Sequence, residues 1–458
     1  MKDMTKGPVA GHVLQLASFI ALTTLFQTLY FLADLYFVGR LGKEAVAGVS
    51  LSGNLAFVVL ALTQALGVGA TSLVAQALGR RERALAELVF NQALVLSTLT
   101  GLAFGAVAFL GRSAYCRALA ADGATAASGV AYLGWFVPAL AMQFLLVAFG
   151  AALRGMGDVK IPTLIQVATV LLNIALAPTL IFGWLSGRPL GVRGAALASF
   201  LAIVAGCVAF VLYFRRAESP FRFRPPDWIP RPRLWGQMLR IGVPAGGEFA
   251  LLSVYMILVY DITRRFGASA QAGFGIGARV MQALFLPAVA IAFATAPVVG
   301  QNYGARLGSR VREAARTAGS MAAAVMLVFT VLCHIAPDAL VRFFNADPNV
   351  VQFGAEYLRI VSWNFVASGL VFVTSSVFQG LGNTLPALAS SSLRLLLFAL
   401  PAYLWSRQPG FEMRHVWYLS VATVTLQIAV NLWLLGRELR LKLPAAPLAE
   451  VEAAPSPS

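Results

Sequence analysis

A single carboxylate inside a long apolar run carries the clearest chemical signal in this sequence. Asp34 lies in LTTLFQTLYFLADLYFVG, and no lysine or arginine stands three or four positions away to neutralise it. An ionised aspartate near the centre of a membrane helix costs on the order of 3 kcal/mol on insertion scales. Such a group can alternate between a protonated and a charged form, so we predict a proton- or cation-binding role for Asp34. The simpler alternatives are a hydrogen bond between helices and a side chain that extends to the membrane surface, since Asp34 lies in the outer part of its helix.

Two further polar residues interrupt apolar segments. Asn173 lies in TVLLNIALAPTLIFG at a depth comparable with that of Asp34, so the two side chains could share one site. The default role of an intramembrane asparagine is a hydrogen bond between helices. Glu248 follows Pro244 in IGVPAGGEFALL, where neighbouring glycines leave space. A proton or cation role and a structural role in a broken helix are equally open for Glu248.

Two arginines also lie within apolar stretches. We expect Arg279 and Arg394 to pair with Glu248 or with a helix C-terminus, and lining a route for anionic groups is the alternative. Three neutral polar residues complete the set of possible substrate or ion contacts: Gln27, Tyr30 and Gln143.

No recognised catalytic constellation accompanies these residues. His12, His334 and His415 are far apart, and the sequence lacks CxxC, HExxH, GxSxG and a Walker-type glycine loop. The three cysteines indicate neither a disulfide framework nor a metal site. We therefore predict that the chain is not an enzyme, has no catalytic or metal-binding residues, and uses an ion gradient or another subunit as its source of energy.

The elements that position these residues are membrane helices. Of 458 residues, 59% are hydrophobic and 12% are charged, with a mean hydropathy of +0.77, which predicts an all-α polytopic membrane protein. Stretches of about 20 apolar residues match a bilayer core. Twelve can be read: 13–38, 46–76, 88–110, 127–153, 161–183, 194–214, 239–263, 272–300, 317–337, 353–378, 386–405 and 416–436.

The twelve stretches form two copies of one half, because residues recur at a shift of 225 positions. Gln76 and Gly79 return as Gln301 and Gly304. Other recurring residues are Asp122, Gly155 and Gly157, which return as Asp347, Gly380 and Gly382. Six helices per half place both halves in the membrane with the same orientation. The sequence thus predicts two parallel six-helix lobes around a central cavity.

The polar segments set the boundaries and the orientation. We predict an N-terminal lobe over 1–214, a linker over 215–238, a C-terminal lobe over 239–437 and a tail over 438–458. With both termini in the cytoplasm, the inner segments carry about twice as many lysines and arginines as the outer ones. The net charge of +16 therefore serves topology and contact with membrane lipid, and no nucleic-acid partner is expected.

Four sequence segments together resemble one known family. They are ADLYFVGRLG at 33–42, the pair LVAQALG and VVGQNYG, the pair ALRGMGD and VFQGLGN, and LLNIALAPTLIFGWLSGRPLGVRGAALA at 171–198. Their order and spacing are similar to those of the multidrug and toxic compound extrusion family, within the larger group that includes lipid-linked sugar flippases. The resemblance covers residues 10–437.

The resemblance implies a monomeric antiporter of the bacterial inner membrane that exports cationic or lipophilic small molecules against inward flow of protons or sodium. Asp34 matches the family's acidic residue that binds the coupling ion, and Asn173 matches its polar partner. This chain has Ala177 and Ser368 where many or some members have aspartate. Both changes remove carboxylate oxygens that sodium would use, so we expect protons as the coupling ion.

Three alternatives to drug export remain open. A flippase for a lipid-linked saccharide or other lipid precursor would be favoured by Arg279 and Arg394 facing the cavity, and drug export by the same residues buried against acids. An uptake carrier of the major facilitator type is suggested by LADLYFVGRLG, but that string ends the first helix and faces outward. A polytopic enzyme is least favoured, since no reacting constellation is present.

Overall fold

The long apolar stretches fold into helices, and no strand occurs among the residues that the structure describes. The computed structural model describes residues 2–184, 187–216 and 219–443. The elements of the first half are α1 (Val9–Gly39), α2 (Lys43–Ser50), α3 (Ser52–Gly79), α4 (Arg83–Leu119), α5 (Gly123–Gly155), α6 (Lys160–Phe182) and α7 (Val192–Arg215). Those of the linker and second half are η1 (Pro225–Trp228), α8 (Pro232–Arg264), α9 (Ala268–Gly304), α10 (Gly308–Ile335), α11 (Pro337–Arg342), α12 (Pro348–Val361), α13 (Asn364–Gly380), α14 (Leu385–Trp405) and α15 (Met413–Lys442).

The predicted number of membrane spans is confirmed. In the described part of the chain, eleven helices are long and apolar enough to cross a membrane, or twelve when α12 and α13 count as one span. These two helices meet at an angle of 57°, so the stretch expected over 353–378 is bent and not continuous. The prediction of an all-α membrane protein with two six-helix lobes is therefore correct.

Several predicted boundaries differ from the structure. The stretch expected over 46–76 is divided between α2 and α3, and α8 begins at Pro232 within the predicted linker. Proline is tolerated in the first turn of a helix, because the backbone N–H that it lacks would have no partner there. In the predicted tail, α15 continues to Lys442, and residues 444–458 lie outside the described residues.

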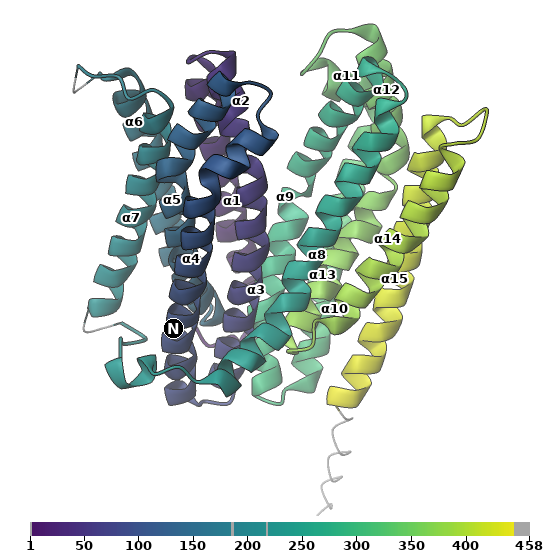
Figure 1. Cartoon of the computed structure of the whole chain (residues 1–458). Helices are drawn as coiled ribbons and strands as arrows, with labels where there is room; N and C mark the ends of the chain where they lie inside the picture. Colours follow the sequence, from purple (N-terminus) through teal and green to yellow (C-terminus); the bar gives the residue numbers. More distant parts are fainter. Residues whose placement is uncertain (1, 185–186, 217–218, 444–458) are drawn as a thin grey trace, which may run out of the picture.

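The two lobes stand side by side and diverge toward one end. The N-terminal lobe contains α1 to α7 and the C-terminal lobe α8 to α15, and the start of the chain lies at the end where the lobes meet (Figure 1). Helices α1 and α3 of the first lobe pack against α8 and α9 of the second. We call the end that contains residues 76–79 and 301–304 the closed end.

Repeat-related residues cap corresponding helices in the two lobes. The Asp122 carboxylate accepts a hydrogen bond from the Thr125 backbone N–H at 2.7 Å, and Asp347 accepts from Asn349 and Val350 at 2.8 and 3.3 Å. Both aspartates are N-caps, of α5 and α12. The hydrogen bond from the Thr125 backbone holds the pKa of Asp122 below its usual value. The recurrence of these aspartates is thus explained by helix capping.

The closed end is formed by the same residues from both halves. A Cβ on Gly79 would lie 2.0 Å from the Gln301 carbonyl oxygen, and one on Gly304 would lie 2.2 Å from the Gln76 carbonyl oxygen. Because these distances are shorter than any van der Waals contact, only glycine lets α3 and α9 approach so closely. The repeated QxxG pattern therefore marks a helix crossing on the axis between the lobes.

Hydrogen bonds across the lobes accompany this helix crossing. The Gln76 Nε2 donates to the Gly380 carbonyl at 2.9 Å, and the repeat-related Gln301 Nε2 donates to the Gly155 carbonyl at 3.2 Å. The N-terminal segment joins them, because the Met4 backbone N–H donates to Gln301 Oε1 at 3.0 Å. The closed end is thus held by close packing and by buried polar contacts in both directions.

Candidate functional site

The Asp34 carboxylate lies in the half of α1 that is distant from the closed end. Its side chain is half-buried, and its Oδ1 is buried with no hydrogen-bond partner. An unpaired buried carboxylate oxygen is costly, so an acceptor left without a partner is suited to take a proton or a cation. The Asp34 carboxylate thus has an open acceptor, and its role in binding a proton or a cation stays a prediction.

A hydrogen-bonded group from three helices lies beside Asp34. Tyr30, one turn earlier on α1, makes a hydrogen bond of 2.8 Å to Ser199 Oγ on α7. Asn173 on α6 donates from Nδ2 to the same oxygen at 3.3 Å, and its Oδ1 is buried without a partner. Tyr30 and Asn173 are thus linked through Ser199, and Asp34 lies one turn from Tyr30 without a hydrogen bond to the group.

Two residues of this site escaped prediction from the sequence. Ser199 joins Tyr30 to Asn173, and Tyr132 on α5 is buried within electrostatic range of Asp34 and Tyr30. Small hydroxyl residues are common in membrane helices, and a lone tyrosine matches ordinary packing. Only the position of Tyr132 in the repeat, where it returns as Tyr357, could have drawn attention to it.

Glu248 occupies a separate position in the C-terminal lobe. On α8, its two carboxylate oxygens lie 2.8 and 2.6 Å from Ser375 Oγ on α13 and share the single hydrogen that this hydroxyl donates. Among the described residues Glu248 has no ion pair, so the first of the two expected partners of Arg279 and Arg394 is wrong. The other expected partner, a helix C-terminus, stays a prediction. A hydroxyl donor satisfies this carboxylate in place of a cation.

Replacing Ser375 with alanine is expected to destabilise the C-terminal lobe by about 1–3 kcal/mol, because a half-buried carboxylate loses its hydrogen-bond donor. Thermal unfolding of the purified protein measures this loss, and Ser368→Ala on the same helix is the matched control. An equal loss of stability in the two variants would show that the hydrogen bond from Ser375 to Glu248 does not stabilise the lobe.

The two candidate arginines have different environments. The Arg394 guanidinium lies over the Tyr255 ring, 5.0 Å from its centroid, and its Nε is buried without a hydrogen-bond partner. The face of an aromatic ring attracts a cation, which explains how Arg394 is accommodated without an acid. Arg279 is exposed and has no ion pair among the described residues.

The remaining candidates lie outside these hydrogen-bonded groups. Gln27 is exposed and Gln143 is half-buried, and neither side chain makes a hydrogen bond in the described part of the chain. Their role as substrate or ion contacts stays a prediction. Ala177, which stands where many family members have aspartate, is buried beside Pro178 and offers no side-chain oxygen.

The two lobes share one polar motif but differ in the charge beside it. Tyr30 and Tyr255 are related by the 225-residue shift. Tyr255 makes a hydrogen bond of 3.0 Å to Ser420 Oγ, which also accepts from Asn364 Nδ2 at 3.2 Å. A tyrosine–serine–asparagine group thus occurs in each lobe, but the second is not a copy of the first: Asn173 corresponds to Phe398 on α14, whereas Asn364 lies on α13. Asp34 lies one turn from Tyr30, whereas the Arg394 guanidinium lies over the Tyr255 ring, so the charge beside the tyrosine is negative in the first lobe and positive in the second.

Both lobes match the model of one known protein family. The family model described as MatE matches residues 20–179 and 244–404, one segment in each lobe. The chain belongs to the MatE family. The family resemblance noted in the sequence is therefore correct, and this MatE chain is a member of a family of multidrug efflux transporters.

Individual relatives of this MatE chain support the same assignment. The probable multidrug resistance protein NorM of Thermotoga maritima is 27% identical over 414 residues, which cover 89% of this chain and 88% of the relative. A relative from Shewanella oneidensis named as an FAD transporter is 24% identical over 414 residues, covering 88% of this chain and 89% of the relative.

A solved structure matches the fold of this MatE chain over nearly its whole length. It is a multidrug resistance MATE family transporter in an outward-facing conformation, with a TM-score of 0.88 and 23% identity, covering 96% of this chain and 98% of the other. The two-lobe helical architecture is thus shared with this transporter.

Proposed function

We propose that the chain is a secondary antiporter that exports cationic or lipophilic small molecules, coupled to inward proton flow through Asp34. The observation that carries the proposal is the unpartnered Asp34 Oδ1 beside the Tyr30–Ser199–Asn173 group. No basic side chain within the described residues pairs with Asp34, so its charge is available to a cation or a proton. Family membership supports export of small molecules as the task.

Alternating access would then follow from competition at Asp34. The charged carboxylate attracts a cationic substrate, and protonation removes that attraction and releases the substrate. A ligand can shift a conformational equilibrium only by its different affinity for the two states. A change of charge at a half-buried residue of α1, which packs against α9 of the other lobe, gives such a difference.

The closed end is assigned to the cytoplasm, with both termini on that side of a bacterial inner membrane. The positive-inside bias supports this orientation, because residues near the closed end include Arg80, Arg81, Arg306 and Arg310. The cavity between the lobes would then open outward. We further propose that the chain acts as a monomer, with small molecules and membrane lipid as its partners and no cofactor beyond the coupling ion.

Protons are favoured over sodium by the oxygen atoms available near Asp34. Sodium, like other hard cations, needs several oxygen ligands, and Ala177 provides none. Among the described residues, no group of three His, Cys, Asp or Glu side chains could hold a metal ion. A single carboxylate is sufficient for a proton.

A second candidate function is that of a flippase or exporter of a lipid-linked saccharide or other lipid precursor. Arg279 is exposed without an ion pair in the described part of the chain, and Arg394 lies against an aromatic ring and not against an acid, which leaves both charges available if these residues face the cavity as this alternative requires. The relative named as an FAD transporter adds support.

Efflux measurements in cells that lack their own exporters decide between these functions. The chain is expressed, and export of cationic and anionic fluorescent compounds is followed while the proton or the sodium gradient is collapsed. The proposal predicts that cationic dyes are exported, that export stops when the proton gradient is collapsed, and that it continues when only the sodium gradient is collapsed. Export of anionic compounds only would support the second candidate, and dependence on sodium alone would contradict proton coupling.

A further inference from the structure

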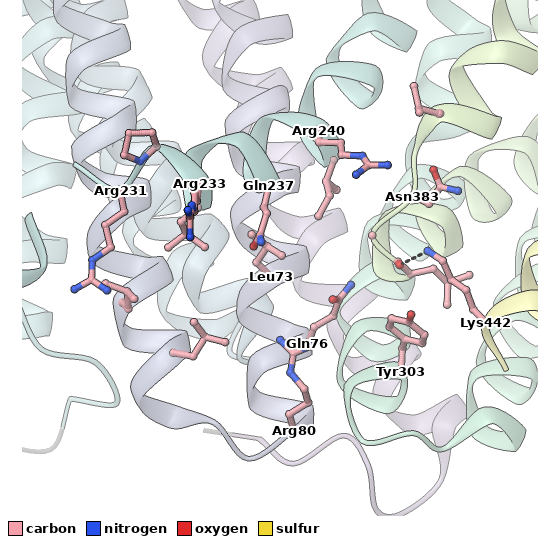
Figure 2. A pocket seen from close by; sticks show the side chains of 18 of the residues that line it. Leu73, Gln76, Arg80, Arg231, Arg233, Gln237, Arg240, Tyr303, Asn383 and Lys442 are labelled. Carbon is pink, nitrogen blue, oxygen red and sulfur yellow. Dashed lines mark hydrogen bonds between the residues drawn. The ribbon is translucent and has the colours of Figure 1, made fainter. Parts of the chain in front are cut away.

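A cavity of about 1150 Å³ lies at the closed end, between the two lobes and apart from Asp34 and Glu248. The N-terminal lobe contributes residues of α3 and α4, and the C-terminal lobe contributes the start of α8, the end of α9, the turn before α14, and α15. Figure 2 shows side chains from these separate elements around one space. The cavity therefore exists as described only while the lobes are in contact at this end.

The lining of this cavity is strongly basic. No carboxylate lines the cavity among the described residues. The lining contains five cationic side chains, those of Arg80, Arg231, Arg233, Arg240 and Lys442. Clustered charges of one sign beside low-dielectric walls focus the electric field and concentrate ions of the opposite sign. An anion is thus the ligand that the charge pattern favours.

Two of these cations are free of acidic partners. Arg80 pairs with Glu82 at 3.0 Å, Arg231 with Asp227 at 3.4 Å, and Lys442 with Glu438 at 2.9 Å. Within the described residues, Arg233 and Arg240 have no ion pair. Both lie on the first two turns or so of α8, where the chain enters the second lobe. They are therefore the cations most available to a bound anion.

The rest of the lining is suited to an amphiphile. Leu73, Leu234 and Leu385 line the cavity together with the amides of Gln237 and Asn383. Apolar surface beside unpaired arginines matches a phosphate group attached to an apolar chain. The cavity also lies where membrane helices end, which is the level of lipid head groups.

We propose that this cavity binds a phosphate-bearing anion, and that binding stabilises contact of the lobes at the closed end. Arg233 and Arg240 hold the phosphate, and both lobes supply the walls. A ligand that binds only the conformation with the lobes in contact raises the population of that conformation by mass action. The site is independent of which compound the protein transports.

Binding is measured with the full-length purified protein and three probes: a short-chain phosphatidylglycerol, a phosphatidylcholine of equal chain length, and inorganic phosphate. We expect phosphatidylglycerol or phosphate to bind, and Arg233→Gln with Arg240→Gln to weaken that binding at least about tenfold. The matched control is Arg215→Gln with Arg216→Gln, which removes the same charge from α7 and its C-cap outside the cavity. The control is expected to retain the affinity of the parent.

Binding of phosphatidylglycerol alone identifies a lipid as the source of the phosphate, and binding of inorganic phosphate identifies a soluble compound. Equal binding of phosphatidylcholine, or equal losses in the two double variants, would overturn the proposal. A second readout is alkylation of Ser72→Cys, a buried position at the closed end, in a protein without its native cysteines. The bound probe should slow alkylation in the parent and not in the Arg233/Arg240 variant, and an unchanged rate in the parent would overturn the conformational part.

Discussion

Proton-driven export falls by about a hundredfold or more when Asp34 is replaced by asparagine, because the variant keeps the shape of the side chain and loses its charge. The asparagine amide does not take up a proton near neutral pH, so it cannot alternate between a state that attracts a cation and one that releases it. Transport of a cationic dye into inverted vesicles with an imposed pH gradient measures this loss.

The control for Asp34→Asn is Asp261→Asn. Asp261 is an exposed acid late in α8, the helix that corresponds to α1 in the C-terminal lobe. Its neutralisation removes the same charge from the protein and is expected to leave export unchanged. Export by Asp34→Asn at the rate of the parent would show that Asp34 does not couple transport to protons.

Replacing Gly242 with alanine is expected to separate the lobes at the closed end. A Cβ at this position would lie 1.7 Å from the Ala65 carbonyl oxygen, so α8 and α3 must move apart. Overpacking of this kind costs about 1–3 kcal/mol and sometimes more, which shifts the conformational equilibrium by about 5-fold to 150-fold. Export is expected to fall, because the conformation with the closed end in contact becomes rare.

Gly236→Ala is the matched control for Gly242→Ala, since it lies on the same helix and a Cβ there would meet no atom within 4 Å. Alkylation of Ser72→Cys should be faster in the Gly242 variant and unchanged in the Gly236 variant. Equal alkylation rates in the two would mean that the contact between Gly242 and Ala65 does not hold the closed end together.

The helices and the repeat could be predicted because each depends on local composition. A run of apolar residues must form a helix in a membrane, since its backbone has no water to bond with. The break between α12 and α13 was not predictable, because Ser362 and Trp363 fit a continuous helix as well as a bent one. The QxxG recurrence was visible, but its meaning depends on how α3 and α9 cross.

The candidate site was predictable only in part, for a related reason. Asp34 and Asn173 stand out because a polar side chain in an apolar run is costly. Ser199 and Ser375 do not stand out, although their hydroxyls bond to Asn173 and Glu248. Pairing of Arg394 with Glu248 was predicted wrongly, because an acid and an aromatic ring both stabilise a buried cation and the sequence does not show which lies nearer.

Proton movement during transport tests the central claim most directly. The purified protein is reconstituted into liposomes that contain a pH indicator, and a cationic substrate is added without any gradient of protons or sodium. Antiport through Asp34 predicts that protons move opposite to the substrate in the parent and that Asp34→Asn gives no proton movement. Substrate transport without proton movement in the parent, or equal proton movement in the variant, would contradict it.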